Sequence, residues 1–187
     1  LFLFADARSY THYAGHFGGF LQPFLARPTR TAVLLRDPVE RVISHHAHGL
    51  RDPRLPLHAL IDGRSLDEAL LDPATSGYVQ NYQAKFLASL DYGRYLLPHE
   101  LHNLSWPSND DDLLHAAQRA LDAIDIVGVF EELPTFLDRL ADGWSMPRLP
   151  PPTPANIGYN RPREQLQPAV KQRLQALNAV VSSDTRN

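Results

Sequence analysis

The fold class is decided by the stretch Thr31-Ala32-Val33-Leu34-Leu35-Arg36-Asp37-Pro38-Val39-Glu40. Its first half, residues 31–35, is aliphatic or β-branched without alternation, which predicts a strand covered on both faces, as in a parallel sheet. The second half predicts a helix that begins at Pro38 and runs to about Gly49, with Asp37 as N-cap and Glu40 as its capping-box partner. A strand, a sharp turn and a capped helix form half of a βαβ unit.

The remainder of the chain continues this alternation. We expect loops over 51–63 and 97–112, helices at 66–71 (capped by Ser65), 73–89 and 113–123, and a second buried strand at 124–130 followed by a helix at 131–142. A Pro-rich arm at 147–162 and a last helix at 163–181 complete a single domain over 1–187. The pattern predicts an α/β fold, a parallel sheet flanked by helices.

Composition excludes several classes of protein. The chain has 187 residues, enough for one domain, and a net charge of −3, which argues against a nucleic-acid partner bound through a broad basic surface. It has no cysteine, so disulfides, thiol nucleophiles and cysteine zinc sites are excluded. No apolar run approaches the roughly 18 residues of a membrane span, so we expect no membrane segment in this chain. The apolar opening Leu1–Phe4 is too short for a signal peptide.

The turn after the first strand is the best candidate for a binding site. Ligands of open α/β sheets bind at the carboxyl ends of strands, and Arg36 occupies that end. Its guanidinium can hold a phosphate through two parallel hydrogen bonds, and the Ser44 hydroxyl, eight residues on, can add a third. Arg41 either joins them or pairs with Asp37 or Glu40. The alternative for Arg36 is a plain ion pair with a neighbouring carboxylate.

This stretch also resembles a known family. Residues 33–46, from Val33-Leu34-Leu35-Arg36 to Ile43-Ser44-His45-His46, closely resemble the 3′-phosphate-binding segment of PAPS-dependent sulfotransferases, nearest to the carbohydrate branch with the heparan-sulfate 2-O-sulfotransferases and their bacterial relatives. Residues 81–88 resemble the family's N-x-Q-x-(R/K)-x-L helix, 126–131 its VG-x-x-E strand, and 156–163 its closing loop. The resemblance spans about 15 to 178.

The resemblance implies a P-loop-like sulfotransferase fold and transfer of a sulfuryl group from the co-substrate PAPS (3′-phosphoadenosine 5′-phosphosulfate) to a hydroxyl, with a carbohydrate as acceptor and without a metal. It implies that Arg36 and Ser44 hold the 3′-phosphate and that Arg163 lies near the adenine or the 3′-phosphate. His16, within Gly15-His16-Phe17, is the implied general base, a task that suits an unperturbed pKa of about 6.5. His12 is a second candidate, and packing beside Phe17 is the structural alternative for His16.

Two parts of the family pattern are not found in residues 1–187. One is the Gly-rich, Lys-bearing 5′-phosphosulfate loop, which we expect upstream of Leu1, so that the chain would be truncated and lack the first βα unit. The other is the closing acidic-Leu-Tyr pattern, where this chain has Asn178-Ala179-Val180-Val181. Two functions follow as hypotheses: a sulfotransferase, or a truncated or decayed module that binds PAP (the product left by PAPS) and transfers nothing.

A third hypothesis is a metal hydrolase. His45 and His48 share a helix face and could bind a metal with the Asp110-Asp111-Asp112 run. The alternative for the aspartates is a place at the start of a helix, where acidic side chains complement the helix dipole. For the histidines, the alternative is that one replaces an aromatic residue of the family and the others face solvent. We expect no metal, and a cytoplasmic location unless an upstream segment supplies an anchor of the kind that holds animal relatives in the Golgi.

Overall fold

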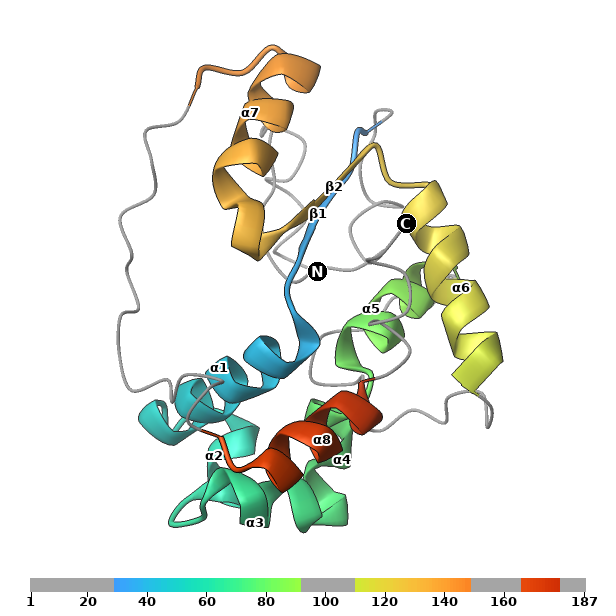
Figure 1. Ribbon diagram of the computed structural model, residues 1–187. Coiled ribbons are helices and arrows are strands. Elements are labelled where there is room, and N and C mark those ends of the chain that lie inside the picture. Colours follow the sequence, from blue (N-terminus) through green and yellow to red (C-terminus); the bar gives the residue numbers. More distant parts are fainter. Residues whose placement is uncertain (1–28, 92–109, 149–165, 179–187) are drawn as a thin grey trace, which may run out of the picture.

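Two parallel strands lie at the centre of the computed structural model, which describes residues 29–91, 110–148 and 166–178 (Figure 1). Strand β1 (Ala32–Leu35) pairs with β2 (Ile126–Val129), with Ala32 opposite Ile126 and Leu35 opposite Val129. The sequence prediction of two parallel strands is confirmed. Because the strands run the same way, their carboxyl ends meet at one edge of the sheet.

Helices make up most of the described chain. They are α1 (Pro38–Arg51), α2 (Pro56–Ile61), α3 (Leu66–Leu71), the short 3₁₀ helix η5 (Pro73–Thr75), α4 (Ser76–Val79), α5 (Tyr82–Asp91), α6 (Asp110–Asp122), the 3₁₀ helix η7 (Phe130–Glu132), α7 (Leu133–Trp144) and α8 (Pro168–Leu177). None of these helices has the length and apolar character needed to cross a membrane.

Most helices lie where the sequence predicts them, but three expectations were wrong. The last helix, expected over 163–181, starts at Pro168 and ends at Leu177. The stretch expected as loop over 51–63 contains α2, which starts at Pro56 and buries Leu57 and Ile61. The single helix expected over 73–89 is divided, because Asn81 has a positive φ of 47°. That conformation cannot continue a right-handed helix, so α4 ends before Asn81 and α5 leaves in a new direction.

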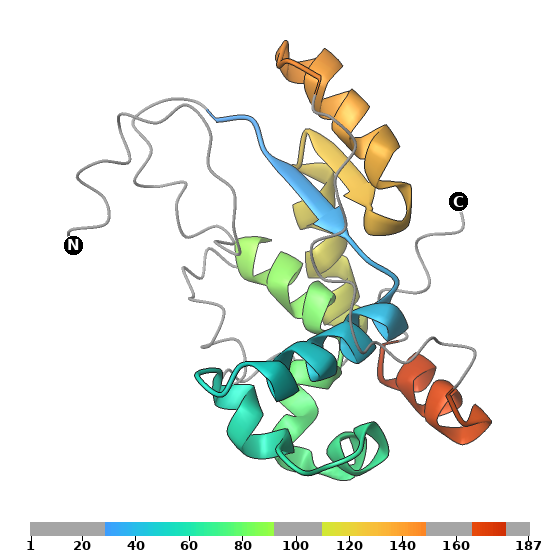
Figure 2. The same cartoon turned by 90° about the vertical axis from the view of Figure 1, so that its left-hand side faces the viewer.

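Helices cover both faces of the sheet (Figures 1 and 2). On one face, Phe136 of α7 packs directly on Gly128 of β2, where a Cβ atom would overlap the phenylalanine ring. On the other face, Val33 and Leu35 of β1 pack against a core shared by α5 and α6. That core consists of Ala84, Leu87, Ala88, Leu113, Ala116, Ala117 and Ala120. The cover is less complete than the unalternating sequence predicts, because all four residues of β1 are half-buried and only Ile126 of β2 is buried.

A second core fixes α1, and α1 carries the candidate site at its start. Val39, Val42 and Ile43 are buried on one side of this helix. They pack against Leu70 of α3, Val79 of α4, Leu174 of α8 and Leu166, which lies two residues before α8. The first turn of α1 is therefore held on one side by β1 and on the other by this core.

Candidate functional site

The candidate site lies at the edge where both strands end. Arg36 and Asp37 join β1 to α1, and we call these two residues the Arg36 turn. The 3₁₀ helix η7 follows β2 directly and brings Phe130 and Glu131 to the same edge. The sequence prediction that Arg36 stands at the carboxyl end of a parallel strand is thus confirmed.

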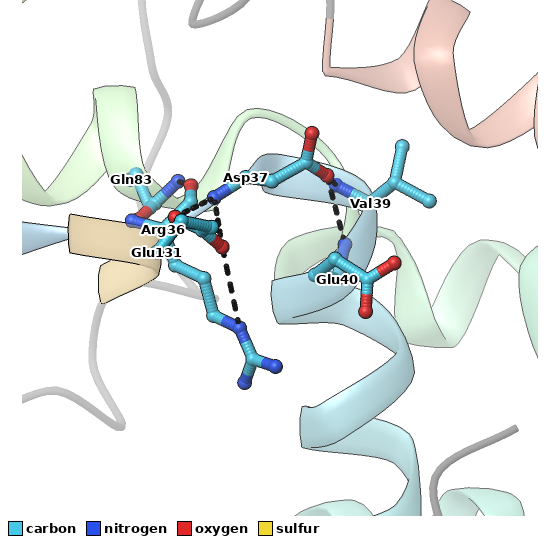
Figure 3. Close-up of polar contacts among 6 residues, drawn as sticks. All are labelled: Arg36, Asp37, Val39, Glu40, Gln83 and Glu131. Carbon is cyan, nitrogen blue, oxygen red and sulfur yellow. Dashed lines mark hydrogen bonds and ion pairs between the residues drawn. The ribbon is translucent and has the colours of Figure 1, made fainter. Parts of the chain in front are cut away.

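Gln83 is the second residue of α5, and its side chain forms hydrogen bonds with both backbone polar groups of Arg36 (Figure 3). Its side-chain Oε1 accepts a hydrogen bond of 2.9 Å from the Arg36 N–H. Its Nε2 donates one of 2.8 Å to the Arg36 carbonyl. A residue 47 positions later in the chain therefore fixes the peptide groups on either side of the Arg36 side chain.

Glu131 holds the other half of the turn. Its carboxylate accepts a hydrogen bond from the Asp37 N–H, with N···O distances of 3.3 and 3.4 Å. Its Oε1 also lies 3.9 Å from Nε of Arg36. Glu40, expected to return to Asp37 as a capping-box partner, instead turns its carboxylate away from that N–H (Figure 3). The capping-box expectation was wrong because Glu131 occupies the position.

The backbone N–H groups that follow the Arg36 turn also donate hydrogen bonds within the protein. The Asp37 carboxylate accepts from the N–H groups of Val39 and Glu40 at 2.9 and 3.0 Å, which confirms Asp37 as the N-cap. The N–H of Arg41 donates to the Asp37 carbonyl at 2.9 Å. Each backbone N–H from Arg36 to Arg41 therefore has a hydrogen-bond partner; Pro38 has no N–H. An anion at this turn must therefore be bound by side chains rather than by a backbone nest.

The Arg36 guanidinium is held in place by two neighbours, but its terminal nitrogens keep their hydrogen-bond donors. It lies over the Phe130 ring, with Cζ 4.9 Å from the centroid. Its Nε is buried and makes no hydrogen bond. The terminal nitrogens point away from Glu131 (Figure 3). Among the residues that the structure describes, no hydrogen-bond partner of these nitrogens is found. The ion-pair alternative is therefore realised at Nε alone, which leaves the bidentate edge of the guanidinium for a ligand.

Ser44 lies farther along the same helix. It is half-buried, seven residues after the N-cap Asp37. At 100° per residue, that spacing returns Ser44 to the face of α1 on which Asp37 lies. About two helical turns separate Ser44 from Asp37, so one phosphate touches both Arg36 and Ser44 only if the long Arg36 side chain extends along the helix toward the serine.

Arg41 does not join the anion site. Its Nη2 donates to the Tyr78 carbonyl at 2.8 Å, and its guanidinium lies 4.7 Å from the Tyr82 ring centroid. Burial lowers the pKa of Arg41 to about 10, partly offset by Tyr82, which raises it. The expectation that Arg41 binds the ligand or pairs with Asp37 or Glu40 is corrected: it satisfies the last carbonyls of α4, which a helix leaves unpaired.

The three histidines of α1 have separate environments. His45 packs edge-on against Tyr78 and Tyr82, each at 5.9 Å between centroids, and its Nδ1 lies 3.3 Å from the Arg41 cation. His46 is half-buried and burial lowers its pKa, whereas His48 is exposed. Only His48 therefore faces solvent freely.

The metal hypothesis gains no support from these positions. Asp110, Asp111 and Asp112 form the first turn of α6, which is the helix-start role given above as their alternative. Within residues 29–91, 110–148 and 166–178, no group of three histidine or carboxylate side chains could hold a metal ion.

Sequence reasoning missed the residues that build the turn. Gln83 and Glu131 stood in segments that resemble the family pattern, but no role was expected for either. The signals for Glu131 were its place as the last residue of the VG-x-x-E pattern and directly after the predicted strand. For Gln83 they were its place in the N-x-Q pattern and beside the buried Ala84 at the start of α5.

Two of the expected site residues, His16 and Arg163, lie outside the described residues, as do His12, the family's closing loop at 156–163 and most of the Pro-rich arm. Comparison with protein family models, with curated proteins and with solved structures found no match for this chain. The site therefore stands on its own geometry.

Proposed function

We propose that the chain is a sulfotransferase of the P-loop-like fold, which binds the 3′-phosphate of PAPS at Arg36 and Ser44 and transfers the sulfuryl group to a carbohydrate hydroxyl. The observation that carries the proposal is the meeting of three sequence segments at the Arg36 turn. These are residues 33–46, 81–88 and 126–131, each of which resembles a segment of that family.

Resemblance along the sequence does not require contact in space. Gln83 bonds Arg36 from 47 residues away, and Glu131 bonds Asp37 from 94 residues away. Segments of a family pattern that meet at one strand end are what a shared ligand site requires, since ligands of α/β sheets bind there. The free edge of the Arg36 guanidinium then supplies the planar, doubly donating group that suits a phosphate.

The charge around the turn sets a condition on the ligand. Figure 3 shows the carboxylates of Asp37, Glu40 and Glu131 around the Arg36 turn, and that of Glu131 lies 3.9 Å from Nε of Arg36. A phosphate dianion is repelled by them, so the proposal needs a second cation in the bound state. Arg163 is the residue that the family resemblance assigns to this place.

The proposed transfer balances without a metal. His16 takes the proton of the acceptor hydroxyl, and the oxygen forms a new bond to sulfur. The bond between sulfur and the bridging phosphate oxygen breaks, and PAP leaves with the electron pair. Positioning the two reactants in line is the main task of the protein in such a transfer.

A second candidate function is a module that binds PAP and transfers nothing. This candidate needs only the nucleotide-binding part of the site, the Arg36 turn, whose guanidinium contacts Phe130 and Glu131. Incubation with PAPS and a mixture of polysaccharides separates the two candidates. The sulfotransferase forms PAP in an acceptor-dependent way, and the module does not.

Binding is tested by calorimetric titration of the full chain with PAP and with adenosine 5′-monophosphate, which lacks the 3′-phosphate. We expect Arg36→Ala to weaken PAP binding about a hundredfold, since two charge-assisted hydrogen bonds are lost. We also expect the monophosphate to bind the wild-type chain about as weakly as PAP binds this variant. Arg54→Ala is the matched control, because Arg54 is an exposed arginine paired with Asp52 beyond the far end of α1.

Two results contradict the proposal. One is equal affinity of the wild-type chain for PAP and for the monophosphate. The other is PAP binding that Arg36→Ala leaves unchanged.

A further inference from the structure

We infer that Gln83 is a positioning residue of the anion site, which acts on the ligand through Arg36 and touches no part of the ligand itself. The inference rests on the function proposed above. It assigns to the N-x-Q segment the task of aiming the Arg36 guanidinium.

Arg36 stands just past the end of the β ladder. The last pair of the ladder joins Leu35 to Val129, so the sheet supplies no partner for the N–H and C=O of Arg36. Gln83 supplies both, with hydrogen bonds of 2.9 and 2.8 Å in a half-buried position. Its side-chain amide thus does for Arg36 what a neighbouring strand would do.

The chemistry of glutamine suits this task. Its side-chain amide carries one acceptor and two donors, so it can complement the N–H and the C=O of a single residue. A glutamate would keep the acceptor, lose the donor and set a negative charge against the Arg36 carbonyl. An asparagine would keep both groups but is shorter by one methylene, so it would not reach the Arg36 backbone from the same helix position.

Gln83 itself is held firmly. The next residue, Ala84, is buried in the core that α5 shares with α6, as are Leu87 and Ala88 one turn farther on. The amide therefore ties the backbone of Arg36 to a packed helix rather than to a loop. Together with the contacts of Phe130 and Glu131 with the guanidinium, this leaves the terminal nitrogens of Arg36 as its free donors. A preorganised donor loses less freedom when the ligand binds.

A double-mutant cycle tests this role. PAP affinity is measured for four full-length chains: wild type, Gln83→Met, Arg36→Ala and the double variant, with weak binding followed by NMR titration. We expect Gln83→Met to weaken PAP binding about tenfold when Arg36 is present. In the Arg36→Ala chain we expect the same change to cost less than twofold. Gln172→Met, at an exposed position of α8, is the control for the substitution itself and should leave affinity unchanged.

Each other outcome overturns a distinct statement. Equal losses in both backgrounds, or no loss in a folded Gln83→Met chain, overturn the positioning role while the proposed function stands. PAP binding that does not depend on Arg36 overturns the proposed function and this role with it. If Gln83→Met does not fold, Gln83→Asn replaces it in the cycle with the same expected pattern, because it adds no charge and its side chain is too short to reach the Arg36 backbone.

Discussion

Glu131 accepts a hydrogen bond from the backbone N–H of Asp37, across 94 residues of sequence. Asp37 lies two residues after the end of β1, and Glu131 lies in the 3₁₀ helix that follows β2. One exposed carboxylate therefore links the ends of both strands. The same carboxylate lies 3.9 Å from Nε of Arg36. Glu131 therefore stabilises the turn and also offsets part of the positive charge that an anionic ligand would need.

These two effects can be separated by Glu131→Gln. The amide oxygen still accepts from Asp37, but the negative charge beside Arg36 is gone. We expect PAP to bind a few fold more tightly, and we expect this gain to shrink as salt rises, because salt screens exposed charges. Titrations at about 0.05 and 0.5 M salt measure it. Glu132→Gln, the exposed neighbour, is the control, and weaker binding by Glu131→Gln at both salt concentrations would contradict the charge argument.

Arg36→Lys tests whether the fork or the charge matters. The turn offers no free backbone N–H from Arg36 to Arg41, so the side chain alone must bind the phosphate. Lysine keeps the charge but gives up the two parallel donors and the planar stacking on Phe130. We expect at least a tenfold loss of PAP affinity in the same titration. Affinity within twofold of wild type would show that a point charge suffices.

Gly128→Ala tests the packing that places β2. A Cβ at this position would overlap the Phe136 ring, so α7 or the strand must move. We expect a loss of about 1–3 kcal/mol in the free energy of unfolding, the usual cost of overpacking. Urea unfolding at neutral pH measures it. Gly143→Ala is the control, since a Cβ there meets only the Ile126 side chain, at 3.2 Å, and alanine favours the helix. A smaller cost at Gly128 than at Gly143 would contradict the packing argument.

The sequence was enough to predict the elements but not their junctions. Residues 31–35 and 124–130 predicted two parallel strands, because an unalternating aliphatic run needs cover on both faces. The capped start of α1 was likewise evident from Asp37 and Pro38. The break at Asn81 was not, because nothing local forbids a helix through 73–89. It is supported by distant partners, the Leu177 carbonyl and the Asp110 carboxylate, which accept from Asn81.

The candidate site divides in the same way. The place of Arg36 at the strand end could be predicted because it depends on local sequence, whereas the role of Ser44 stays a prediction. Gln83 and Glu131 are the Gln and the Glu of the N-x-Q and VG-x-x-E motifs, but they act on backbone groups 47 and 94 residues away, so the motifs alone did not predict their partners. Arg41 shows the converse. Its place in α1 suggested a role in the anion site. Instead, the Arg41 guanidinium donates to the carbonyls of Tyr78 and Val79, because α4 ends beside this arginine.

His46 should make stability depend on pH. Its Nε2 is buried without a hydrogen-bond partner, and burial lowers its pKa below the ordinary value of about 6.5. The unfolded chain therefore takes up a proton at a pH where the folded chain does not. The free energy of unfolding is therefore highest above about pH 6.5, where His46 is neutral in both states, and it falls as the pH approaches the lowered pKa of the folded chain.

We expect the melting temperature to fall between pH 7.5 and pH 5.5, and to fall less in His46→Gln, which has no proton to gain. Differential scanning calorimetry at both pH values measures the change. His48→Gln is the control, since His48 lies on the same helix but is exposed, and it should show the full wild-type decrease. An unchanged pH dependence in His46→Gln would mean that the other titrating groups of the chain, and not the buried imidazole, set its stability in this range.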